Sequence, residues 1–183
     1  MNSSNIKLAE LAALADVSYH EDLRPQVLKD MSFDPNPYYR FLYAIAYRYK
    51  PKVAVELGTS YGGGTQHLAY GNPEGVVYSI DNHQIAKNLP ANVHLIEGDT
   101  RNRDYALFPD KSVGLLFIDS THEANHAWQE YATWYFALIV GAIILADDIY
   151  MAGMREFWDR ITLPKFQHDG LHDTCGFGVA VNL

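Results

Sequence analysis

The stretch that decides the fold is Val53-Ala54-Val55-Glu56-Leu57-Gly58-Thr59-Ser60-Tyr61-Gly62-Gly63-Gly64-Thr65. Four of its first five residues are apolar and two of these are β-branched valines, which predicts a buried strand. The glycines that follow favour positive φ angles and let a ligand approach the backbone where a helix begins. No lysine follows them, so the turn is not a P-loop, and their spacing differs from that of dinucleotide-binding turns. A ligand-binding strand-turn-helix unit is predicted; a turn with only a packing role is the alternative.

Short β-rich runs alternate with helical runs through the rest of the chain. Most expected strands are apolar on both faces, which is typical of a parallel sheet covered by helices on each side. The last two strands flank a polar loop and are expected to pair antiparallel. The sequence predicts an α/β, Rossmann-like doubly wound sheet, mostly parallel with an antiparallel C-terminal edge strand. The expected strands are 53–57, 76–80, 93–96, 113–118, 142–146, 165–168 and 176–182, and the helices among them are 62–70, 122–138 and 154–161.

The first fifty residues read as helices added to this sheet. Ser4 is a candidate cap for an N-terminal helix, and Pro25 interrupts a second polar segment. The run Asp34-Pro35-Asn36-Pro37 predicts a turn, an N-cap and a proline in the first helical turn, before a helix that ends ahead of Pro51. We therefore divide the chain into an N-terminal helical lid or appendage, 1–35, folded over the top of a Rossmann-like domain, 36–183.

Composition limits the function classes. The chain has 183 residues, with 14 basic and 22 acidic side chains that give a formal charge of 14 − 22 = −8. This balance argues against nucleic acid as a partner unless the few cations gather on one face. The single cysteine, Cys175, excludes an internal disulfide and a thiolate cage for zinc or iron–sulfur, and fits a reducing, cytoplasmic location. The sequence shows no signal peptide and no membrane-length apolar run.

Two acids stand at the ends of the second and third expected strands. In doubly wound sheets ligands bind outside the carboxyl ends of the strands. Asp81 is placed to accept hydrogen bonds from both hydroxyls of a ribose, although a helix-capping aspartate would look the same. Asp99 is placed to accept from an adenine amine, and an Asx-turn is its alternative.

The order Glu56-x-Gly58-x-x-x-Gly62, then Asp81, then Gly98-Asp99 resembles the first motifs of class I S-adenosylmethionine-dependent methyltransferases. Within 38–182, Asp119-Ser120-Thr121-His122 and Asp147-Asp148-Ile149 resemble a small-molecule O-methyltransferase subfamily, methyltransferase family 24-like, with Asp-Gly-x-His and His-Asp-Ile motifs. The departures are Ser120 for glycine, Ala124 for tyrosine, Ala142 for glycine and Asp147 for histidine. The resemblance implies that S-adenosylmethionine is held by Glu56, Gly58, Thr59, Ser60, Gly62, Asp81, Asp99 and Asp119.

Three carboxylates are expected to meet after the fourth and fifth strands: Asp119, Asp147 and Asp148. They also resemble the metal site of catechol-type O-methyltransferases, and such hard oxygen ligands suit Mg²⁺, Ca²⁺ or Mn²⁺. Three acids without a cation would raise one another's pKa. The alternative is that one faces solvent and another caps the helix near Gly153.

His122, with Asp119, is the candidate catalytic group. A neutral imidazole on the first helical turn would take a hydroxyl proton while the methyl group leaves sulfur. His122 could instead be a metal ligand or a plain residue at a helix start.

Two further groups are weighed against plainer roles. A metal site formed by His168, Asp169, His172, Asp173 and Cys175 is less favoured than a solvated loop. Core cover is favoured over a substrate lid for most of the early tyrosines, which are Tyr38, Tyr39, Tyr43, Tyr47 and Tyr49.

The resulting hypothesis is a methyltransferase acting on a hydroxyl of a small molecule with S-adenosylmethionine and a divalent cation. The alternatives are a non-catalytic nucleoside-binding protein and a metal-dependent tailoring enzyme of the same fold. The sequence leaves the acceptor and a possible homodimer open.

Overall fold

The computed structural model describes residues 3–31, 36–104 and 108–183. Within these residues the strands form one sheet in the order β3-β2-β1-β4-β5-β7-β6. The first five strands of the chain are parallel, and β7 and β6 continue the sheet antiparallel. The strands are β1 (Val53–Leu57), β2 (Val76–Asp81), β3 (Val93–Glu97), β4 (Val113–Ile118), β5 (Leu138–Ala146), β6 (Lys165–His168) and β7 (Phe177–Val181). The Rossmann-like fold is confirmed.

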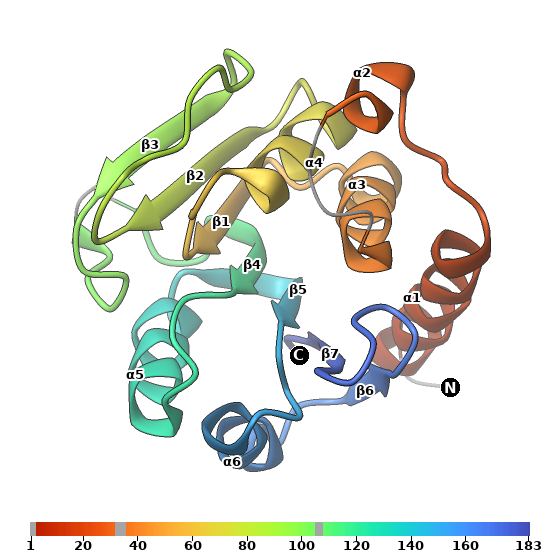
Figure 1. Ribbon diagram of the computed structural model, residues 1–183. Helices are drawn as coiled ribbons and strands as arrows, with labels where there is room; N and C mark the ends of the chain where they lie inside the picture. Colours follow the sequence, from red (N-terminus) through yellow and green to blue (C-terminus); the bar gives the residue numbers. More distant parts are fainter. Residues whose placement is uncertain (1–2, 32–35, 105–107) are drawn as a thin grey trace.

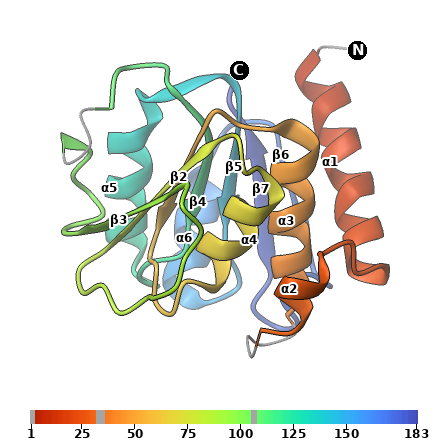
Figure 2. The ribbon, with the colours of Figure 1, turned by 90° about the horizontal axis from the view of Figure 1, so that it is seen from above.

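Helices cover both faces of the sheet (Figures 1 and 2). They are α1 (Ser3–His20), α2 (Gln26–Lys29), α3 (Pro37–Tyr49), α4 (Gly63–Gly71), α5 (Ala124–Tyr135) and α6 (Ala152–Arg160). One core cluster joins the sheet to α5 and α6, and the other joins it to α1, α3 and α4. The side chains of β4 alternate between them, because Leu116 and Ile118 face the first cluster and Leu115 and Phe117 the second. No helix among the described residues is long and apolar enough to cross a membrane.

Three expected elements differ from the structure by more than a shift of one or two residues at an end. Helix α5 ends at Tyr135, before the expected Leu138, and β5 begins at Leu138 instead of Ala142. Gly141 has a φ of +80°, and the pairing of β4 with β5 shifts register at this place, so the strand continues through an irregularity. Strand β3 is not buried on both faces, because it lies at the sheet edge, where its residues are half-buried or exposed.

The N-terminal helices differ in detail from the expectation. Helix α1 begins at Ser3, one residue before the expected cap. It packs beside α3 and the β6–β7 hairpin, where Leu11 and Ala15 are fully buried. Asn36 stands at the N-cap of α3 and Pro37 in its first turn, but the Asn36 side chain makes no capping hydrogen bond. The expected turn at Asp34-Pro35 lies outside the described residues. The division at residue 35 stays a prediction.

Candidate functional site

Strand order reverses between β1 and β4, and the loops after these two strands touch at the carboxyl edge of the sheet. Gly58, the first residue after β1, has a φ of +99°. A Cβ at this position would lie only 2.0 Å from the carbonyl oxygen of Asp119, which follows β4. Glycine is therefore required here both by the left-handed backbone and by the close approach of the two loops.

Asp81, at the end of β2, organises the turn after β1. Its Oδ2 atom accepts hydrogen bonds from the backbone N–H groups of Thr59 and Ser60, each at 2.9 Å. Its Oδ1 atom accepts from the N–H of His83 at 3.2 Å. The carboxylate thus holds the glycine turn in place, which is close to the capping role weighed as its alternative.

A cavity of about 350 Å³ opens beside this turn, at the carboxyl ends of β1 to β4. Three predicted cofactor residues line it: Gly58, Asp81 and Asp99. The complete lining is Gly58, Asp81, Asn82, Gly98, Asp99, Thr100, Arg101, Ser120, Thr121 and His126. The other predicted cofactor residues, which are Glu56, Thr59, Ser60, Gly62 and Asp119, are not part of this lining.

Glu56 lies beneath the turn and is 1% exposed. Its carboxyl group accepts hydrogen bonds from Ser79 Oγ at 2.5 Å and from Thr65 Oγ1. Burial raises the pKa of Glu56 to about 7, although these hydrogen bonds oppose the shift. A Cβ on Gly64 would lie 2.3 Å from Glu56 Oε1, so the glycine run also makes room for this carboxyl group.

Asp99 is held by Arg101 at the mouth of the cavity. The Arg101 side chain donates to both carboxylate oxygens, from Nε to Oδ1 at 2.9 Å and from Nη2 to Oδ2 at 2.7 Å. The Arg101 N–H also donates to Oδ1 at 2.9 Å. These hydrogen bonds lower the pKa of Asp99 to about 2. The Asx-turn weighed as the alternative is therefore present, and Asp99 lines the cavity as well. Sequence reasoning did not single out Arg101, although an acid and an arginine two residues apart were a possible signal.

Glu130 of α5 joins the loops after β3 and β4. It is fully buried, and its Oε1 atom accepts from Ser120 Oγ at 2.6 Å and from Thr100 Oγ1. His126 Nε2 lies 3.1 Å from the same oxygen, and this hydrogen bond raises the pKa of His126. The i, i+4 spacing of His126 and Glu130 on a helix was the signal that could have placed His126 in the site.

Three carboxylates follow β4 and β5, either in the same loop as the cavity-lining Ser120 and Thr121 or in the neighbouring one. One oxygen from each of Asp119, Asp147 and Asp148 lies within 4.8 Å of the others, as the sequence predicts. Burial raises the pKa of Asp119 well above its usual value, and the charges of Asp147 and Glu56 add to the shift. None of the three caps α6 with its side chain, because the N-cap is Met151 and forms no such bond. Clustered hard oxygen donors of this kind fit a divalent cation.

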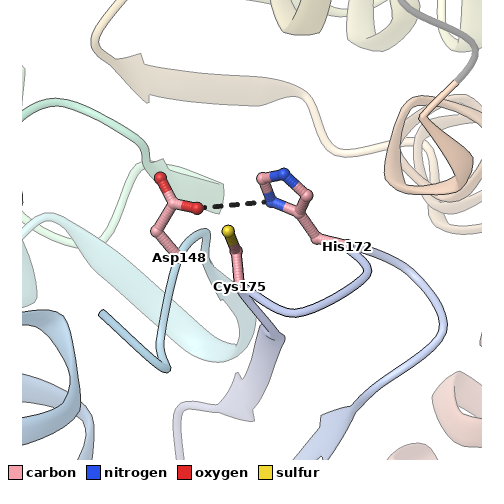
Figure 3. A group of neighbouring side chains, drawn as sticks. All are labelled: Asp148, His172 and Cys175. Atoms are coloured by element: carbon pink, nitrogen blue, oxygen red, sulfur yellow. Dashed lines mark ion pairs between the residues drawn. The ribbon is translucent and has the colours of Figure 1, made fainter. Parts of the chain in front are cut away.

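His172 contacts the same cluster, which corrects the expectation of a solvated loop. It lies between β6 and β7, and its Nδ1 atom is 2.6 Å from Asp147 Oδ1 and 3.4 Å from Asp148 Oδ1 (Figure 3). The hydrogen bond to Asp147 raises the pKa of His172. Cys175 Sγ also lies beside Asp148 and His172. By contrast, His168 points elsewhere and pairs with Asp16 of α1 at 3.0 Å.

The sequence predicts His122 on the first turn of a helix beginning at residue 122, but it lies in the loop before α5, which begins at Ala124. Its Nε2 atom is 2.6 Å from Asp148 Oδ2, and its side chain is 45% exposed. The loop is also pressed against α6, because a Cβ on Gly153 would lie 2.0 Å from the carbonyl oxygen of His122. His122 therefore contacts one predicted metal ligand and remains open to solvent.

The early tyrosines have mixed roles. Tyr38 is 7% exposed, stacks on Phe177 with ring centroids 5.6 Å apart, and lies 5.2 Å from the His172 ring. Tyr39 stacks on His67, whereas Tyr47 is 63% exposed. Core cover holds for Tyr38, which also contacts His172 beside the carboxylates.

Solved structures of other proteins share the fold described above. The chain resembles an O-methyltransferase from Bacillus cereus, solved with SAH, at 19% identity and a TM-score of 0.67 over 96% of this chain and 91% of that one. A putative caffeoyl-CoA O-methyltransferase from Staphylococcus aureus matches at 12% identity and a TM-score of 0.66, over 96% of this chain and 100% of that one. The O-methyltransferase TomG from Streptomyces achromogenes, solved with SAM, matches at 15% identity and a TM-score of 0.63, over 94% of this chain and 89% of that one. At these identities the likeness shows the fold.

A search of curated proteins finds no match. A family model described as a methyltransferase domain matches residues 55–149, which is more than half of the chain and spans the glycine turn, the cavity and the three carboxylates. The chain therefore belongs to the methyltransferase-domain family, which confirms its resemblance to the class I S-adenosylmethionine-dependent methyltransferases.

Proposed function

We propose that this methyltransferase transfers the methyl group of S-adenosylmethionine to a hydroxyl oxygen of a small molecule, with help from a divalent cation. The observation that carries the proposal is the position of the loop after β4. Ser120 and Thr121 of this loop line the cavity, while Asp119 and His122 belong to the carboxylate cluster. A methyl donor in the cavity and an acceptor at the cluster would lie on adjacent sides of one loop.

The residues of the cavity fit S-adenosylmethionine. Gly58 lines the cavity with backbone atoms alone, at the turn where a ligand would meet the end of β1. A carboxylate has about four acceptor positions, and Asp81 uses three for backbone N–H groups, which leaves capacity on Oδ1 for a ribose hydroxyl. Asp99 lines the same cavity, and its ion pair with Arg101 favours the charged form of the carboxyl group. The proposed cofactor set is Glu56, Gly58, Thr59, Ser60, Gly62, Asp81, Asp99 and Asp119.

The carboxylate cluster fits the acceptor side of the reaction. Asp119, Asp147 and Asp148 would hold Mg²⁺, Ca²⁺ or Mn²⁺, which as a Lewis acid makes a nearby hydroxyl more acidic. His122 is the proposed general base. If Nε2–H donates to Asp148, the Nδ1 lone pair is left to accept the hydroxyl proton. Asp148 would then fix both the tautomer and the orientation of the ring.

The first experiment tests the methyl donor. Adenosylhomocysteine at about 100 times its Kd should stabilise the folded protein by about 2.7 kcal/mol. For a domain of this size that is a rise in Tm of roughly 5–11 °C. NAD at the same concentration is the control and should leave Tm unchanged. A rise with NAD alone would assign the cavity to another nucleotide and contradict the proposal.

The second experiment tests the reaction. Methyl transfer from labelled S-adenosylmethionine to a panel of phenols and sugars should require Mg²⁺ and stop in excess EDTA, while adenosylhomocysteine binding persists. His122→Ala should lower kcat by about 10²–10⁴ if His122 is the base. Full transfer in EDTA would remove the cation from the mechanism. Donor binding without transfer to any hydroxyl would favour a nucleoside-binding protein or a tailoring enzyme with other chemistry.

A further inference from the structure

A second group of possible metal ligands overlaps the three carboxylates but has different chemistry. Asp148, His172 and Cys175 offer an oxygen, a nitrogen and a sulfur atom that lie within 4.8 Å of one another. Figure 3 shows the three side chains converging, Asp148 from the loop after β5 and the other two from the loop between β6 and β7. Nothing in the proposed methyl transfer uses Cys175.

Backbone hydrogen bonds fix the two loops that carry these ligands. The N–H groups of Cys175 and Gly176 both donate to the carbonyl oxygen of His172 at 2.9 Å, so a tight turn places His172 and Cys175 together. The N–H of Tyr150 donates to the carbonyl oxygen of Cys175 at 2.8 Å, and that of Ile149 donates to Gly176 at 3.3 Å. These last two bonds join the turn to the chain just after Asp148. The three donors are therefore brought together by the fold.

The ring of His172 is also oriented. Its Nδ1 atom faces Asp148 and Cys175 (Figure 3), and it lies 2.6 Å from Asp147 Oδ1. Tyr38, 5.2 Å away between ring centroids, packs on the imidazole. A cation bound to His172 Nδ1 would replace the proton between this atom and Asp147 Oδ1. The Asp147 carboxylate would then lie beside the cation or serve as its fourth ligand.

We propose that Asp148, His172 and Cys175 form a binding site for a thiophilic divalent cation, of which Zn²⁺ is the best fit. Zinc accepts sulfur, imidazole nitrogen and carboxylate oxygen in one tetrahedral site, whereas Mg²⁺ requires oxygen ligands. The proposal rests on the proposed function only in that both use Asp148. A bound Zn²⁺ would occupy the carboxylate that contacts His122 at 2.6 Å.

The test is a titration of the whole protein with Co²⁺, a spectroscopic substitute for Zn²⁺, without methyl donor or acceptor. Coordination by Cys175 should give a thiolate-to-cobalt charge-transfer band, and Zn²⁺ added afterwards should abolish it. Excess Mg²⁺ should not. Cys175→Ser should remove the band, and His172→Gln should weaken Zn²⁺ binding by at least about 10-fold. The exposed His83→Gln is the matched control and should bind as the parent protein does.

Several results would overturn the site. One is a wild-type protein that shows no charge-transfer band; another is a Cys175→Ser variant that keeps its Zn²⁺ affinity. Unchanged affinity in His172→Gln would show that Cys175 binds cobalt as an isolated surface thiol. Asp119→Asn should retain the band while losing Mg²⁺-dependent transfer, which separates the two donor sets. Because the titration contains neither donor nor acceptor, its failure leaves the proposed methyl transfer intact, and a failed transfer assay leaves this site intact.

Discussion

Gly58 carries two constraints that can be separated by mutation. Gly58→Ala must place a Cβ at a φ of +99° and 2.0 Å from the Asp119 carbonyl oxygen. We expect it to lower the free energy of unfolding by ~3–4 kcal/mol and to abolish adenosylhomocysteine binding. Gly141→Ala is the matched control, because Gly141 has a φ of +80° but its Cβ would meet only Lys7 Nζ at 3.8 Å. Its cost should be the strain of the left-handed backbone alone, ~1–2 kcal/mol. If Gly58→Ala and Gly141→Ala lower the free energy of unfolding in urea by the same amount, the contact between Gly58 and the loop after β4 is unimportant for stability.

Asp81 joins a structural and a proposed binding role in one side chain. Asp81→Ala removes the acceptor for the N–H groups of Thr59 and Ser60 together with the proposed ribose contact. We expect adenosylhomocysteine binding, measured by calorimetry, to weaken by roughly 1.5–3 kcal/mol. Asp159→Ala, which removes an exposed carboxylate of α6, is the control and should bind normally. Unchanged affinity in Asp81→Ala would contradict the assignment of the cavity to the nucleoside.

At the scale of elements, a mutation in α1 would test whether residues 1–35 are a separable appendage. Leu11 is fully buried against the second core cluster, so Leu11→Ala should lower the free energy of unfolding by ~2–5 kcal/mol in one cooperative transition. The control is Leu23→Ala, whose side chain is 44% exposed and whose loss should change stability by less than ~0.5 kcal/mol. A separate early transition in Leu11→Ala, with the main midpoint unchanged, would instead support an independent lid.

Elements with continuous apolar runs between turn residues were predictable from the sequence. The expected limits of the mainly apolar β1 and β4 agree with the structure, as do those of the polar β6. The convergence of Asp119, Asp147 and Asp148 follows from parallel strands that end at one edge. The first residues of β5 were missed, because Gly141 reads as a strand boundary and the pairing that continues past it is non-local. The contact of His172 with Asp147 was missed for a similar reason. It depends on how the loop between β6 and β7 folds back over β5, which no periodicity in that loop records.

At the scale of the whole molecule, stability should depend on pH through Glu56. Burial raises the pKa of its carboxyl group to about 7 in the folded protein, from about 4.5 for an exposed glutamate. Between these values the folded state holds a proton on Glu56 that the unfolded state has lost, so the Glu56 contribution to stability falls as the pH rises from about 4.5 to about 7. Burial lowers the pKa of His67 to about 4, and its contribution changes in the opposite direction, so the comparison with a Glu56 variant isolates the carboxyl group. Each unit of pKa difference corresponds to about 1.4 kcal/mol. The raised pKa of Asp119 acts in the same direction as that of Glu56.

The measurement is urea unfolding of wild type and Glu56→Gln at a series of pH values. The variant keeps the size of the side chain and carries no titrating proton, so its stability should fall less over this range. Glu74→Gln, at an exposed position, is the control and should follow the wild-type curve. Parallel curves for all three proteins would show that Glu56 does not titrate differently on folding.

The loop after β4 is clamped at two points, by Gly58 at the carbonyl of Asp119 and by Gly153 at the carbonyl of His122. A segment packed tightly at both points is a poor hinge. We therefore do not expect this loop to open and close as reactants enter and leave. Under the proposed function it would instead be a fixed partition between the donor cavity and an acceptor at the carboxylate cluster. Under the proposed function, the distance between donor and acceptor would be set by the partition before either arrives. Turnover would then need no closing motion of this loop to align the reacting atoms, and the slow movements of the catalytic cycle would belong to other parts of the chain.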